Sequence, residues 1–206
     1  MLGAYPLKQR ARHGPMSLLD SARCGAQPVL SPDAASQEHH RTPKASVMPD
    51  TELSLARDLN RLLPAKGVTV AVAEGSTGGR IGERLVRYAG ATAYFKGAIV
   101  TYDYTSRTTL LGIPEPLLSR HGAVSEAAVR AMAEAVRTRF GACVGLASTG
   151  VAGPTGKAVG ELWIALADGS QTIAEHHTVL PRPRTAMQAE FTRLALGMLL
   201  RFTRSL

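Results

Sequence analysis

The chain has 206 residues, 45% of them hydrophobic, which is enough to bury one core and indicates a single folded domain. No stretch approaches the roughly 20 apolar residues that cross a bilayer, and the N-terminus lacks the apolar core of a secretory signal, so we expect a cytoplasmic protein with no membrane partner. The net charge of +8 suits an acidic partner, but no basic run alternates with aromatic residues, which argues against nucleic acid.

The first part of the chain has the composition of an unfolded segment. Residues 1–47 mix Pro, Ser, Ala, Arg and His without a sustained helical or strand period. We therefore predict a disordered N-terminal extension over residues 1–47 and a folded domain over residues 48–206.

The folded part is expected to begin with a helix and a buried strand. Thr51 is a plausible helix cap, and apolar residues recur at helical spacing over residues 53–63 until Pro64 and Gly67 end the run. The short apolar, β-branched run over residues 68–73 is typical of a strand that is buried on both faces.

Residues 73–79 follow this strand and read Ala-Glu-Gly-Ser-Thr-Gly-Gly. The glycines allow a sharp turn and the close approach of a ligand. We expect Ser76 and Thr77 to cap the free amides of the next helix, whose N-terminus favours anions. Any strand-to-helix turn needs similar residues, so the junction alone leaves a structural and a functional interpretation open.

Strands and helices then alternate along the rest of the chain. A long strand is predicted over residues 93–104, with Gly97 as a bulge and Tyr102 near its end. The later elements are a helix over 105–111, a loop containing Pro114 and Pro116, a helix over 126–140 capped by Ser125, a strand over 142–149, a hairpin of strands 159–167 and 171–179, and a helix over 185–202. This order predicts an α/β fold, a three-layer α/β/α sandwich with a mixed sheet.

Several ordered motifs resemble one known family. They are residues 74–79, residues 97–102, Leu-Gly-Ile-Pro at 111–114, His-Gly-Ala-Val-Ser-Glu at 121–126, Thr-Gly-Val-Ala-Gly-Pro at 149–154, and Val-Gly at 159–160 followed by Trp163. From about residue 51 to the end, the chain resembles the C-terminal domain of the CinA family, which includes nicotinamide mononucleotide deamidases. The resemblance implies an amidohydrolase that converts this nucleotide to nicotinate mononucleotide and ammonia.

The resemblance also implies a serine, a tyrosine and a lysine in the active site. The serine position is Gly75 here, with Ser76 beside it, the tyrosine is Tyr102, and the lysine position is Arg107. The catalytic candidates of this chain are therefore Ser76, Tyr102 and Arg107. The candidates for substrate binding lie in two glycine-rich loops: Glu74, Gly75, Thr77, Gly78, Gly79, Thr149, Gly150 and Gly153.

These replacements leave two functions open. Glycine has no nucleophile, and an arginine, with a pKa above about 12, is not a neutral base near pH 7. The chain is either an amidohydrolase of weak or lost activity, with Ser76 as a shifted nucleophile, or a catalytically silent domain that binds a nucleotide or a protein partner. A small-molecule nucleotide is the expected partner, and assembly into a homo-oligomer stays open. Cys24 and Cys143 lack C-x-x-C spacing, so neither a disulfide framework nor a zinc site is predicted. No other metal and no cofactor is predicted.

Overall fold

The computed structural model describes residues 51–206, so the extension predicted for residues 1–47 and the proposed domain start at residue 48 lie outside the described residues. The strands are β1 (Val70–Glu74), β2 (Phe95–Val100), β3 (Val144–Gly150), β4 (Glu161–Ala167) and β5 (Thr172–Thr178). The helices are α1 (Glu52–Ala65), α2 (Arg80–Val86), the 3-10 turn η2 (Ala91–Ala93), α3 (Tyr104–Leu111), α4 (Glu115–His121), α5 (Glu126–Phe140) and α6 (Arg184–Ser205).

The strands form one mixed sheet in the order β2-β1-β3-β4-β5. β1 pairs in parallel with β2 and β3, whereas β4 runs antiparallel to both β3 and β5. The register between β1 and β2 shifts where Gly97 lies, which confirms the predicted bulge. Because β1, β2 and β3 are parallel, the loops that follow them leave the same edge of the sheet, where ligand sites of open α/β sheets occur.

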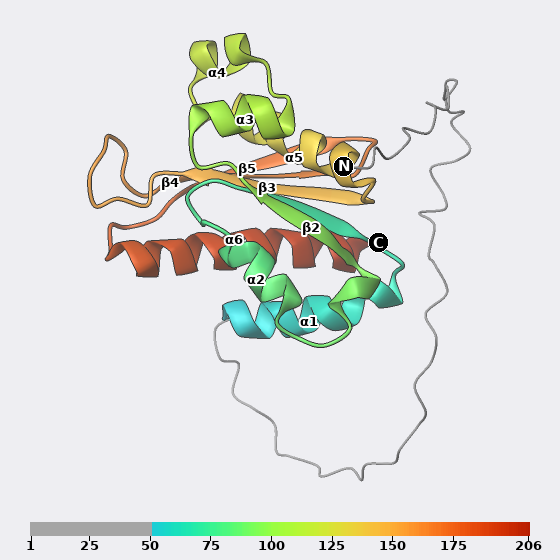
Figure 1. The fold of residues 1–206 in the computed structure, drawn as a ribbon. Coiled ribbons are helices and arrows are strands. Elements are labelled where there is room, and N and C mark those ends of the chain that lie inside the picture. Colours follow the sequence, from blue (N-terminus) through green and yellow to red (C-terminus); the bar gives the residue numbers. More distant parts are fainter. Residues whose placement is uncertain (1–50) are drawn as a thin grey trace, which may run out of the picture.

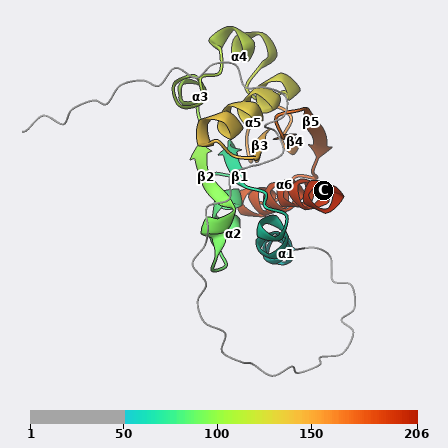
Figure 2. The ribbon, with the colours of Figure 1, turned by 90° about the vertical axis from the view of Figure 1, so that its right-hand side faces the viewer.

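Helices cover both faces of the sheet and confirm the three-layer sandwich. α1, α2 and α6 lie on one face, and α3, α4 and α5 lie on the other (Figure 1), which the view turned by 90° also shows (Figure 2). Along β1, Val70 and Val72 belong to the core under α1 and α6, and Ala71 and Ala73 belong to the core under α5. This alternation follows from the two-residue period of a strand and explains why every residue of β1 is buried.

Gly145 of β3 brings α5 close to the sheet. A Cβ at this position would lie 2.0 Å from the carbonyl oxygen of Ala133 and 2.7 Å from the Cβ of Arg137, both in α5. Any side chain would therefore force the helix away from the sheet, so the packing requires glycine here.

Two local predictions were wrong. β2 ends at Val100 rather than near residue 104, and Tyr102 lies beyond it, because Asp103 caps α3 by accepting from the amide of Ser106 at 2.7 Å. The segment with two prolines is not a loop but contains α4. Pro116 lies in the first turn of α4, where a missing N–H leaves no intrahelical bond unmade.

Within residues 51–206, no helix combines the length and the apolar character that crossing a membrane requires.

Candidate functional site

A small pocket lies where the loops after β1, β2 and β3 meet at the carboxyl edge of the sheet. Its volume is about 260 Å³, and its lining residues come from both glycine-rich loops, from the β2–α3 loop, α3, the α4–α5 connection and the start of α6: Gly75, Ser76, Tyr102, Arg107, Ala123, Val124, Gly150, Val151, Ala152, Gly153, Thr155 and Arg184. The amide of Gly75 donates to the carbonyl of Ser148 at 2.9 Å, so the start of the first loop is bonded directly to β3. The three catalytic candidates thus line one pocket, together with Gly75, Gly150 and Gly153.

Arg107 is a buried cation in the lining of this pocket. It projects from α3 and is only 4% exposed. Its Nη2 donates to the Thr149 hydroxyl at 3.0 Å, its Nη1 donates to the Ala123 carbonyl, and its Nε has no hydrogen-bond partner. Burial lowers the pKa of Arg107, an effect that Tyr104 partly opposes, yet a guanidinium stays protonated in proteins.

Gly75 lies directly beside this guanidinium. A Cβ on residue 75 would be 3.2 Å from the carbonyl oxygen of Ser148 and 3.3 Å from Nη2 of Arg107. The two positions at which this chain departs from the expected catalytic residues are therefore neighbours in space, although 32 residues separate them in the sequence.

Ser76 is buried at 8% exposure, and its hydroxyl has no hydrogen-bond partner among the described residues. The carbonyl of Ser76 accepts from Nε2 of Gln188 at 3.0 Å, which ties this loop to α6. The backbone of Ser76 is thus anchored, and its side chain has no base attached to it.

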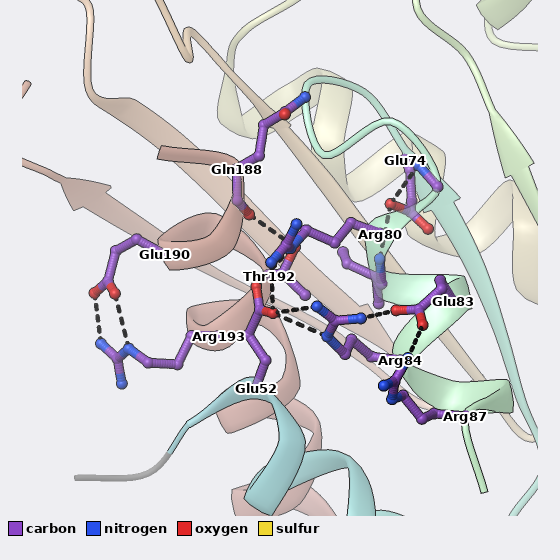
Figure 3. A network of polar contacts seen from close by, with 12 residues as sticks. Glu52, Glu74, Arg80, Glu83, Arg84, Arg87, Gln188, Glu190, Thr192 and Arg193 are labelled. Carbon is purple, nitrogen blue, oxygen red and sulfur yellow. Dashed lines mark hydrogen bonds and ion pairs between the residues drawn. The ribbon is translucent and has the colours of Figure 1, made fainter. Parts of the chain in front are cut away.

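Glu74, a substrate-binding candidate from the sequence, holds the start of α2 in the structure. Its carboxylate, labelled in Figure 3, is fully buried. It accepts from the backbone amides of Gly79 at 2.9 Å, Ile81 at 3.1 Å and Gly82 at 2.8 Å. The expectation that Ser76 and Thr77 cap α2 was therefore wrong. The carboxylate of Glu74 takes up the free amides of this short helix, and the hydroxyl of Thr77 instead pairs with that of Ser148 at 3.0 Å.

The remaining substrate-binding candidates do not line the pocket around Arg107. Thr77, Gly78 and Gly79 face a separate polar hollow beside α2. The arginines of that hollow are already paired, since Glu52 of α1 bonds Arg80 at 2.7 Å and Arg84 at 2.8 Å (Figure 3).

Sequence reasoning missed Arg184, the second cation of the pocket. It stands at the first position of α6 and donates to the Gly153 carbonyl and to the hydroxyl of Tyr102. Tyr102 is 64% exposed, so this pair lies on the open side of the pocket. No local signal marked Arg184, because 82 residues separate it from Tyr102.

A larger hollow of about 520 Å³ lies between the α3–α4 connection and α5. Its lining is mostly apolar and contains none of the predicted site residues: Leu111, Gly112, Ile113, Pro114, Ala131, Glu134, Ala135, Thr138 and Arg139. The convergence of polar groups and loop ends therefore favours the smaller pocket as the functional site.

The fold and the site define an α/β/α domain with a cation-lined pocket at the carboxyl ends of its parallel strands. The family model of the CinA C-terminal domain matches residues 52–203, and the chain therefore belongs to this family.

Individual relatives agree with this assignment. The chain is 43% identical over 145 residues to a CinA-like protein of Syntrophus aciditrophicus, a match that covers 68% of this chain and 34% of that protein. It is 40% identical over 149 residues to a CinA-like protein of Salinibacter ruber, with 70% and 36% covered. The chain thus spans about a third of the length of the curated relatives it matches.

Solved structures of the family share the fold. The competence damage-inducible protein A (ComA) of Klebsiella pneumoniae superposes with a TM-score of 0.71 at 28% identity, covering 74% of this chain and 96% of that one. The competence/damage inducible protein CihA of Agrobacterium tumefaciens gives a TM-score of 0.71 at 30% identity, with 76% and 98% covered.

Proposed function

We propose that this domain binds a pyridine mononucleotide in the pocket around Arg107 and does not hydrolyse its carboxamide at an enzymatic rate. One observation carries the proposal: the guanidinium of Arg107 lies 3.3 Å from the place where residue 75 would carry a Cβ. The positions that the family resemblance assigns to nucleophile and base here hold a residue without a side chain and a permanent cation.

The missing groups matter because amide hydrolysis needs an activated nucleophile, a base and donors for the developing oxyanion. Arg107 can donate hydrogen bonds to an oxygen, but it cannot take a proton near neutral pH. Gly75 offers no hydroxyl. A pocket that binds the substrate without a nucleophile and a base does not accelerate the hydrolysis of the amide.

The second candidate function is amide hydrolysis with Ser76 as nucleophile. The buried and unpartnered hydroxyl of Ser76 in the lining of the pocket favours it. A serine nucleophile, however, is activated by a base within hydrogen-bond reach, and the Ser76 hydroxyl has no such partner among residues 51–206. We therefore prefer the silent binding domain.

Ammonia release from nicotinamide mononucleotide separates the two functions. We expect the wild-type chain to remain near the uncatalysed background, whereas Gly75→Ser with Arg107→Lys should raise the rate far more than either change alone. Nucleophile and base act as a unit, and lysine also removes the Nη2 atom that would crowd a side chain at position 75. Gly197→Ser in α6 is a control remote from the pocket.

Wild-type turnover at about 1 s⁻¹ or faster would contradict the silent assignment. If Ser76→Ala then abolished that turnover, Ser76 would be the nucleophile. If instead the double variant gained nothing, the missing nucleophile and base would not by themselves explain the absence of activity.

A further inference from the structure

We propose that Gly75 and Arg107 form a subsite for a planar carboxylate, so that the ligand is the acid form of a pyridine nucleotide rather than its carboxamide. The inference rests on the proposed function, because it names the chemical form of the ligand in the same pocket. It assigns the two replacements a joint role in recognition.

The first support is a buried positive charge without a counter-charge. Arg107 has a carbonyl and a hydroxyl as partners, and no carboxylate of residues 51–206 pairs with it. Removing a charge from water is costly unless an opposite charge or a full set of hydrogen bonds replaces the solvent, and Nε is still unpaired. An anionic ligand would supply the missing charge.

The second support is the space beside Gly75. The backbone does not require glycine at this position, since its φ lies outside the left-handed region, in contrast to Gly78 with φ +64°. A Cβ on residue 75 would be crowded from two sides, by the carbonyl oxygen of Ser148 at 3.2 Å and by Nη2 of Arg107 at 3.3 Å. Glycine therefore keeps open a position from which a ligand oxygen reaches the guanidinium, because N–H···O bonds span about 2.7–3.2 Å.

The third support is the polarity of the groups that face the ligand. A guanidinium has five donors and no acceptor, so it forms hydrogen bonds with both oxygens of a carboxylate. The NH₂ group of a carboxamide is also a donor and forms no hydrogen bond with it. The unpartnered hydroxyl of Ser76 adds one more donor to the lining. The lining has no carboxylate, and it includes Arg184 as a second cation on the more exposed side, where a phosphate group would fit.

The test is calorimetric titration of the full chain with nicotinate mononucleotide and with nicotinamide mononucleotide, with nicotinate alone and inorganic phosphate alone as further probes. We expect the acid nucleotide to bind at least about tenfold tighter than the amide. Two variants should each reduce this affinity ratio toward one. Gly75→Ala fills the space beside the guanidinium, and Arg107→Lys keeps the positive charge but removes the planar pair of N–H donors. Gly197→Ala and Arg61→Lys are the matched controls, and melting curves check that each variant folds.

The outcomes distinguish the two proposals. Equal affinity for acid and amide would overturn the carboxylate subsite and leave the binding function standing, whereas no binding of either nucleotide would overturn both. A preference for the acid that survives Arg107→Lys would place the recognition elsewhere and reject the subsite. Inorganic phosphate binding with the affinity of the nucleotide, weakened by Arg107→Lys and accompanied by no binding of nicotinate, would make Arg107 a phosphate site and likewise reject the subsite. If Gly75→Ala fails to fold, the ratio of acid to amide affinity measured for Arg107→Lys decides whether the carboxylate subsite stands.

Discussion

Replacing Glu74 by glutamine should destabilise the domain strongly, because the carboxylate of Glu74 holds three backbone amides in a fully buried place. One oxygen accepts from Gly79 and Ile81, and the other accepts from Gly82. Glutamine has a single acceptor oxygen, so its NH₂ group must face at least one of these N–H groups. The variant loses a charge-assisted hydrogen bond of about 1.5–3 kcal/mol and leaves a buried donor without a partner.

We therefore expect the free energy of unfolding to fall by about 2–4 kcal/mol. At about 2–4 °C per kcal/mol for a domain of this size, the melting temperature should drop by about 5–15 °C, measured by circular dichroism. Glu190→Gln is the control. It removes the same charge from a partly exposed pair with Arg193 that is worth at most about 1 kcal/mol. A loss for Glu74→Gln that does not exceed the loss for this control would refute the capping argument.

Three further predictions concern pH, the Ser76 loop and the N-terminal extension. Burial raises the pKa of Tyr94 to about 12, so the contribution of the neutral phenol to stability should be complete below its ordinary pKa near 10 and decline as the pH rises toward 12. Urea unfolding between pH 9 and 12 should show that the wild-type free energy of unfolding falls by about 2–3 kcal/mol more than that of Tyr94→Phe. Equal losses in the two proteins would contradict this prediction. Gln188→Ala removes the 3.0 Å hydrogen bond to the Ser76 carbonyl, which is worth about 1 kcal/mol. Amide hydrogen exchange over residues 75–79 should therefore become about fivefold faster, and unchanged exchange would contradict this prediction. A chain that begins at Met48 should melt within about 2 °C of the full chain if residues 1–47 contribute nothing to folding, whereas a fall of many degrees would reject that prediction.

Local sequence signals determined most of the fold. Ser125 as a cap indicated the start of α5, and Ser125 does accept from the amide of Ala128. Gly97 marked the bulge in β2. These features depend on residues within a few positions of one another, so spacing along the chain reports them directly. α4 was missed for the same reason, because a proline that starts a helix and a proline in a loop look alike in the sequence.

The sequence, through its family resemblance, selected the candidate residues, but only the tertiary structure determined how these residues are arranged. Glu74 and Gly75 are consecutive in the sequence, yet the carboxylate of Glu74 accepts from amides at the start of α2 whereas Gly75 lines the pocket. The proximity of Gly75 to Arg107, and that of Tyr102 to Arg184, arises because separate elements end at the same edge of the sheet. Such neighbours are set by strand order and helix packing over 32 and 82 residues of chain, and no local pattern encodes them.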